Sequence, residues 1–134
     1  MTQSNGPTGS PPPPTPPPSG GAPLSEADAR NMAALAHYLN FTLLGPLIIY
    51  LLKKGQNPFL DTEAKEALNF SLTCLIAHVI ISAAHFVPIP FFFCLLSLAG
   101  LAVLIIQIVF GIQGGKSASA GTPYRYPFNL RLLN

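Results

Sequence analysis

Charge is the scarcest property of this sequence. Only 9% of its 134 residues are Asp, Glu, Lys or Arg, while 49% are hydrophobic. No charged residue occurs between Arg30 and Lys53, or between Glu66 and Lys116. Helices in these stretches would lack a polar face wide enough to meet water, which argues against the core of a soluble protein. The net charge of +2 and the absence of a basic cluster with interleaved aromatics argue against a nucleic-acid partner.

The two charge-free stretches have the lengths of membrane spans. A bilayer crossing takes about 20 apolar residues, each rising about 1.5 Å. The first stretch fits one span, and the second fits two spans joined by a turn at Val87-Pro88-Ile89-Pro90, where two prolines cannot continue a helix. We therefore expect an all-α integral membrane protein with three transmembrane helices, at about residues 32–52, 67–86 and 91–111.

The first of these spans carries Gly45-Pro46 in its middle. Proline removes a backbone hydrogen bond, so this helix is predicted to be kinked or split there. As one kinked span it would place the N-terminal tail across the membrane from the loop 53–66. If the chain turns back at the dipeptide, tail and loop share a side, and the sequence leaves this alternative open.

The two ends of the chain differ from its middle. Residues 1–26 are rich in proline, which favours extended polyproline II backbone and cannot bury a core, so we predict a disordered tail before a helical membrane domain at 27–134. The tail is interpreted as a solvated spacer, with a PxxP ligand for a partner's groove as the alternative.

At the other end, residues 116–134 are predicted to form an interfacial tail. Apolar and polar side chains alternate with period two over residues 124–133, which predicts an extended segment along the membrane interface. We expect Arg125 or Arg131 to lie near Asp61, Glu63 or Glu66.

The positions of Lys and Arg predict how the chain is oriented in the membrane. Lys53 and Lys54 lie between the first two spans, and Arg125 and Arg131 lie after the third. Because Lys and Arg are retained on the cytoplasmic side and suit the interface, the 53–66 loop and the C-terminus are expected in the cytoplasm. The predicted location is a multi-pass position in a bacterial inner membrane.

Small and polar residues recur within the second and third spans at spacings of three and four. This spacing places them on one face of each helix, where small side chains allow close helix packing. We predict that the two faces pack on one another. The residues are Ser71, Cys74, His78, Ser82, Ser97, Gly100 and Gln107.

Three histidines, His37, His78 and His85, are the candidates for metal binding or proton relay within the membrane. No carboxylate or thiolate is placed by spacing to complete a site, and rings seven residues apart on one helix are about 10 Å apart along its axis. Neutral histidines that hydrogen-bond between helices are the favoured interpretation, with no metal and no cofactor. Cys74 and Cys94 are expected at different depths and therefore unpaired.

Four segments resemble a known family: Ala33-Ala34-Leu35-Ala36-His37, Gly45-Pro46-Leu47-Ile48-Ile49-Tyr50-Leu51-Leu52-Lys53-Lys54, Lys65-Glu66-Ala67-Leu68-Asn69-Phe70 and Tyr124-Arg125-Tyr126-Pro127. They are similar to the bacterial family named domain of unknown function 4870, which is Tic-20-like and includes magnetosome membrane proteins. The resemblance covers about residues 27–133 and implies three or four membrane helices without established catalytic residues. Family members often have a longer stretch between the histidine and the Gly-Pro, and its shortness here favours one kinked span.

The sequence supplies no catalytic constellation, so we expect a membrane protein that is not an enzyme. Its predicted role is packing or scaffolding with itself or with other membrane proteins in the lipid bilayer. The alternative is a small transporter or channel subunit for protons, metal ions or small solutes, with His78, His85, Asn40 and Gln107 along its path.

Overall fold

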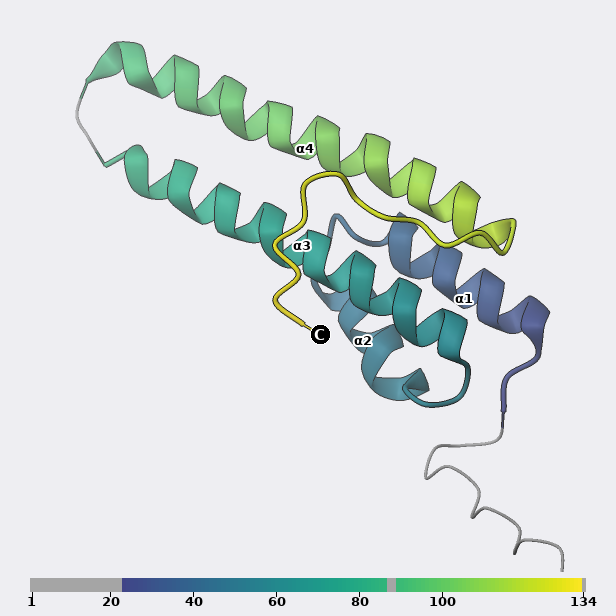
Figure 1. Cartoon of the computed structure of the whole chain (residues 1–134). Coiled ribbons are helices and arrows are strands. Elements are labelled where there is room, and N and C mark those ends of the chain that lie inside the picture. The colour runs from purple at the N-terminus through teal and green to yellow at the C-terminus, as the bar shows by residue number, and fades with distance from the viewer. Residues whose placement is uncertain (1–22, 87–88, 134) are drawn as a thin grey trace, which may run out of the picture.

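The computed structural model describes residues 23–86 and 89–133, which form four helices and an extended C-terminal segment (Figure 1). The predicted disordered tail lies almost wholly outside the described residues, as does part of the predicted turn at 87–90. The helices are α1 (Glu26–Tyr38), α2 (Leu44–Lys53), α3 (Pro58–Ala84) and α4 (Pro90–Ser119).

The first predicted span, 32–52, is split into two helices, which was the alternative to one kinked helix. Helix α1 ends at Tyr38, the chain turns at 39–43, and α2 runs back beside α3. We attribute the break between α1 and α2 to Pro46. Proline has no N–H to donate to the carbonyl of Thr42, and its ring would clash with that carbonyl in a continuous helix. Gly45-Pro46 itself lies in the first turn of α2, where a missing N–H has no helical partner to lose. The break therefore precedes the predicted position.

Helix length limits which helices are candidate membrane spans. With 13 residues in α1 and 10 in α2, these helices are roughly 20 and 15 Å long, short of the ~30 Å hydrocarbon core. Helices α3 and α4 have 27 and 30 residues, or roughly 40 and 45 Å. In the described part of the chain, two helices and not three are long and apolar enough to cross a membrane.

Both long helices extend beyond their predicted bounds at the charged end. Helix α3 begins at Pro58 because the Asn57 side chain caps it, accepting the N–H groups of Phe59 and Leu60 at 2.9 and 3.2 Å. Helix α4 continues to Ser119, so the predicted tail 116–134 begins with the last turn of this helix.

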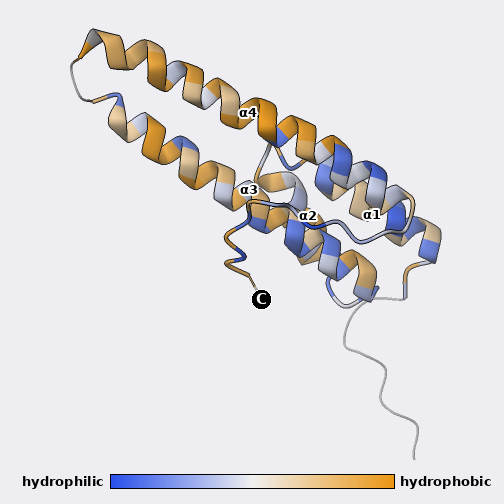
Figure 2. Ribbon diagram, turned by 45° about the horizontal axis from the view of Figure 1, so that its top comes forward, coloured by the Kyte–Doolittle hydropathy of each residue, from blue (hydrophilic) through white to orange (hydrophobic). Residues whose placement is uncertain are grey.

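The four helices divide into two regions that we call the head and the arm. In the head, α1 packs on α3 and α4 around buried alanines, and α2 covers α3. The arm consists of residues 75–86 and 91–102, and none of its described residues is buried. Figure 2 shows that the arm is mainly hydrophobic and that hydrophilic residues gather in the head. Only 6% of the apolar window of α4 is buried inside the chain, so its surface requires an apolar environment.

Candidate functional site

The turn between α1 and α2 leaves the carbonyl of Asn40 buried at the end of a helix. Two side chains from the long helices satisfy this carbonyl: the Ser71 hydroxyl of α3 at 2.7 Å and the Gln107 amide of α4. All three residues are buried. Non-helical backbone is tolerated at membrane depth only where protein groups satisfy it, so Ser71 and Gln107 allow the chain to turn here.

His37 lies beside this turn with its side chain fully buried, between Glu63 of α3 and Tyr126 of the C-terminal segment. Its Nε2 is 2.9 Å from Glu63 Oε2, and its Nδ1 is 2.8 Å from the Tyr126 hydroxyl. The amide of Asn40 donates to the same hydroxyl at 2.9 Å. A neutral imidazole with its proton on Nε2 satisfies every group: Nε2–H donates to Glu63, and Tyr126 O–H donates to Nδ1.

Burial raises the pKa of Tyr126 well above its usual range. The hydroxyl therefore stays protonated and available as the donor to His37.

A row of polar side chains on α3 binds the backbone of the C-terminal segment. Glu63 accepts the N–H of Tyr124 at 3.1 Å, and Glu66 accepts the N–H of Tyr126 at 3.1 Å. The same face of α3 supplies two further contacts: the Asn69 amide pairs with both the N–H and the C=O of Leu133, and the Thr73 hydroxyl accepts the N–H of Leu130. These four α3 residues lie within about a third of the helix circumference. Their side chains hydrogen-bond the backbone N–H and C=O groups of the segment, as the backbone of a neighbouring β-strand does in a sheet.

Glu66 also pairs with both arginines of the segment. Arg125 Nη1 lies 3.3 Å and Arg131 Nε 3.6 Å from Glu66 Oε2, and the carboxylate side chain is only 3% exposed. The prediction that Arg125 or Arg131 lies near an acidic residue of this helix is therefore confirmed. Glu63 and Glu66 are buried under the segment and not at a solvated helix start.

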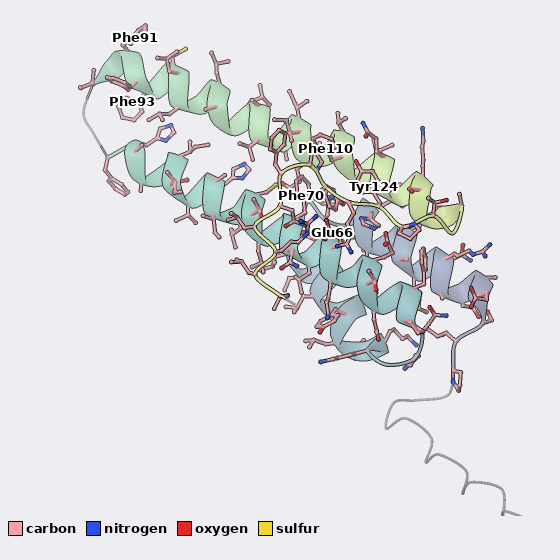
Figure 3. All side chains as sticks on the ribbon, in the orientation of Figure 1. Glu66, Phe70, Phe91, Phe93, Phe110 and Tyr124 are labelled. Carbon is pink, nitrogen blue, oxygen red and sulfur yellow. The ribbon has the colours of Figure 1, made fainter. Side chains whose placement is uncertain are left out.

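Aromatic packing completes the contact between the segment and the long helices. The rings of Phe70 and Tyr126 are stacked with centroids 3.9 Å apart, and Phe110 of α4 meets Phe70 edge to face at 6.2 Å. Figure 3 shows Glu66, Phe70 and Phe110 where the C-terminal segment crosses the long helices, with Phe91 and Phe93 at the far end of the arm.

Helix α4 approaches the end of α1 closely at three glycines: Gly115 faces the Tyr38 ring, and Gly111 and Gly114 face the buried polar residues. A Cβ at Gly111 would lie 2.9 Å from the Asn40 amide nitrogen, and one at Gly114 would lie 2.7 Å from His37 Nδ1. Both distances are shorter than side chains tolerate, so only glycine allows α4 to cover the buried polar residues. We call this set, His37, Asn40, Glu63, Ser71, Gln107 and Tyr126, the polar cluster.

The residues predicted to pack the two long helices together are divided between head and arm. Ser71, Cys74 and Gln107 are buried in the head, while Ser82 and Ser97 are exposed in the arm. An added Cβ at Gly100 would meet nothing within 4 Å, so the helices do not close on one another there. In this region His78 and His85 bond the carbonyls four residues earlier in their own helix, those of Cys74 and Ile81. The role of this set in helix packing stays a prediction.

The three histidines are far from forming one site. His37 is held by the polar cluster, whereas His78 and His85 lie along the arm, and His85 rests against Phe93 with ring centroids 5.6 Å apart. Within residues 23–86 and 89–133, no group of three or more His, Cys, Asp or Glu side chains is placed to hold a metal ion. In that same part of the chain, every buried side-chain nitrogen or oxygen has a hydrogen-bond partner. The residues of the polar cluster thus hydrogen-bond to one another within the head.

Sequence reasoning missed the partnership of His37, Glu63 and Tyr126. One available signal was the spacing of Glu63, Glu66, Asn69 and Thr73, which marks a polar face on a helix that is otherwise entering the membrane. A second was the tyrosine pair of the segment, whose hydroxyls need partners once their rings are buried.

These features define a helical membrane protein with a two-helix apolar arm and a head closed by its own C-terminal segment. The family model of the magnetosome magnetite crystal formation proteins, MamF/MmsF, matches residues 28–133. The chain therefore belongs to this family. Neither the curated proteins nor the solved structures gave a match.

This result corrects the family resemblance drawn from the sequence. The assignment to domain of unknown function 4870 and to Tic-20-like proteins is wrong, because the matching family is MamF/MmsF. The four segments that carried the resemblance all lie within the matched range.

Proposed function

We propose that this chain is a non-enzymatic component of the magnetosome membrane that supports magnetite crystal formation by packing with copies of itself or with other membrane proteins. Family membership supports the compartment and the process. The observation that carries the packing role is the arm, where two apolar helices project from the head and none of their described residues is buried.

Ser97 and Gly100 offer the surface on α4 where another helix would pack. Ser97 is exposed, and the space beside Gly100 is open. Small residues let membrane helices approach closely, and van der Waals packing is then a main source of association. Leu95 and Ile106 lie on the opposite side of α4 and present bulky side chains, 45% and 44% exposed.

Cysteine crosslinking in the native membrane tests this role. In a background without Cys74 and Cys94, a single cysteine at Ser97 forms disulfides only between chains, and we expect it to crosslink more strongly than one at Leu95. A Gly100→Phe substitution should reduce the crosslink and change the magnetite crystals of cells that carry it, as measured by electron microscopy. A strictly monomeric chain without any crosslinked partner would contradict the proposal.

A small transport subunit is the second candidate, and one cleft favours it. Ser71, His78 and Gln107 line a cleft of about 250 Å³ between α3 and α4, beside Phe41 and Leu43 of the turn. Polar groups at this depth are typical of ion and proton paths. Purified protein in vesicles should then conduct protons or metal ions, and His78→Ala should abolish the flux. The absence of flux above that of empty vesicles would exclude this candidate.

The same arrangement supports an orientation of the chain in the membrane. We propose that α1 and α2 form a re-entrant hairpin, so that the N-terminal end of α1, the 53–66 loop and the C-terminal segment all lie in the cytoplasm. The beginning of α1, the beginning of α3 and the end of α4 lie at one end of the molecule (Figure 1). Lys53, Lys54, Arg125 and Arg131 at this end fit the cytoplasmic excess of basic residues.

A further inference from the structure

A groove between α3 and the C-terminal segment brings three cationic side chains together. Lys65, Arg125 and Arg131 line a groove of about 230 Å³ with Asp61 and Glu66. The side chains of Arg125 and Arg131 are 61% and 52% exposed, although both reach the buried Glu66 carboxylate. Each guanidinium therefore keeps donors that face the groove.

The residues that line the groove are held in place by contacts with the rest of the head. Glu66 is fixed by the N–H of Tyr126 and holds both arginines on one oxygen. Arg131 adopts a positive φ of 34°, an unfavourable backbone conformation for a residue with a side chain, and its N–H bonds the Asn129 side chain at 3.4 Å. Such a conformation persists where the surroundings fix it, and here the Arg131 side chain lies against Glu66.

The depth of the groove places it at the membrane surface. Glu66 is the last charged residue before the charge-free stretch that ends at Lys116. From Glu66 to its end at Ala84, α3 spans roughly 27 Å, close to the ~30 Å thickness of the hydrocarbon core. If α3 crosses the core from Glu66 onward, the groove lies at the level of the lipid phosphates.

The flanking side chains fit the same surface. Phe128, Leu130 and Leu132 of the segment are 71%, 56% and 55% exposed, so apolar groups stand next to the cationic groove. Aromatic and aliphatic side chains beside arginine are typical of the interface between headgroups and acyl chains.

The net charge of the groove indicates the kind of ligand that it would bind. Three cations and two carboxylates leave one net positive charge, and Asp61 is already engaged by the N–H of Gly55 at 3.0 Å. A phosphodiester carries one negative charge, and guanidinium forks bind phosphate oxygens in pairs. We propose that this groove binds the phosphodiester headgroup of an anionic phospholipid and that it fixes the C-terminal segment on the membrane surface.

Native mass spectrometry of the full chain in mild detergent tests the proposal, with phosphatidylglycerol as the probe. We expect wild type to retain one lipid, and the double variant Arg125→Gln with Arg131→Gln to bind it at least about tenfold more weakly, since each charged hydrogen bond contributes about a factor of ten. The matched control is Lys53→Gln with Lys54→Gln, which removes the same charge outside the groove and should stay within about twofold of wild type.

A thermal scan separates binding from folding. Phosphatidylglycerol should raise the unfolding temperature of wild type and not that of the arginine double variant. Should that variant fail to fold, Lys65→Gln replaces it, with weaker lipid binding expected. Equal lipid retention by wild type and the groove variants overturns the proposal. Displacement of the lipid by inorganic phosphate at equal concentration also overturns it, because the groove would then bind free phosphate and not a lipid.

Discussion

Tyr126 stacks on Phe70 with ring centroids 3.9 Å apart and planes 9° apart, and its hydroxyl reaches across to His37 at 2.8 Å. One side chain thus connects the C-terminal segment to α3 through its ring and to α1 through its oxygen. Because α1 ends at the buried turn, the segment holds the head together around the place where the helical backbone is interrupted.

The hydroxyl of Tyr126 should contribute measurably to stability. Tyr126→Phe keeps the stacked ring but leaves His37 Nδ1 and the Asn40 amide without their partner. Unpaired buried polar groups cost about 1–3 kcal/mol, so we expect a loss of about 2 kcal/mol in the free energy of unfolding, measured by denaturant titration in detergent. Tyr124→Phe is the matched control, since its hydroxyl bonds Gln113 at an exposed site and its loss should cost less than about 0.5 kcal/mol.

The buried hydroxyl of Tyr126 should also make the stability of the chain depend on pH in the alkaline range. Burial raises the pKa of Tyr126 in the folded chain, so the unfolded chain loses this proton first as pH rises. The stabilisation is complete below the ordinary tyrosine pKa of about 10 and declines above it. Wild type should therefore lose more stability than Tyr126→Phe between about pH 9.5 and 11 in the same titration. Parallel curves for the two proteins would show that this hydroxyl does not ionise on unfolding.

The sequence predicts the parts of this fold that depend on local properties. The charge-free stretch after Glu66 indicates a helical hairpin because span length and apolarity are read directly from consecutive residues. Alternation in the tail indicates an extended segment, and the nearness of its arginines to Glu66 is confirmed. The α1–α2 turn is different, because residues 31–52 have the length of one span. What allows the turn is a pair of side chains, Ser71 and Gln107, whose positions depend on the complete fold.

The polar cluster could not be predicted from the sequence either, because its contacts also depend on the complete fold. Glu63 reads as an acidic residue near a helix start, which is the usual place for such residues. Its burial results from a tail that returns from the end of the chain to cover it. Gly114 lies beyond the third predicted span, 91–111, and only the complete fold shows that it packs against His37 of α1.

Loss of the Glu63 carboxylate should destabilise the head strongly. Glu63→Leu removes the partner of His37 Nε2 and the acceptor of the Tyr124 N–H, both of which are buried away from water. Each buried polar group left without a partner costs about 1–3 kcal/mol, and this substitution leaves two of them. Glu63→Gln keeps one carbonyl oxygen and should cost less. Glu26→Gln, an exposed carboxylate of α1, serves as the control, and a similar unfolding midpoint for all three variants would contradict this role.

Two glycines of α4 should respond oppositely to alanine. Gly114→Ala places a methyl group 2.7 Å from His37 Nδ1, and this overpacking should cost about 1–3 kcal/mol. Gly100→Ala meets no atom within 4 Å, and the better helix propensity of alanine should leave stability unchanged or raise it by up to about 1 kcal/mol. Thermal unfolding of both variants measures the difference. A destabilised Gly100→Ala would mean that the arm is closed against another helix in the conditions used.

The re-entrant hairpin predicts which sites are accessible from each side of the membrane. Single cysteines at Ser25, Thr122 and Phe86, in a chain with Cys74 and Cys94 replaced, mark the start of α1, the segment after α4 and the far end of the arm. Because α1 and α2 are each too short to cross a ~30 Å core, an impermeant maleimide should label Ser25→Cys and Thr122→Cys from one side. Phe86→Cys should be labelled from the other side. Labelling of Ser25→Cys together with Phe86→Cys would instead require a third crossing before α3.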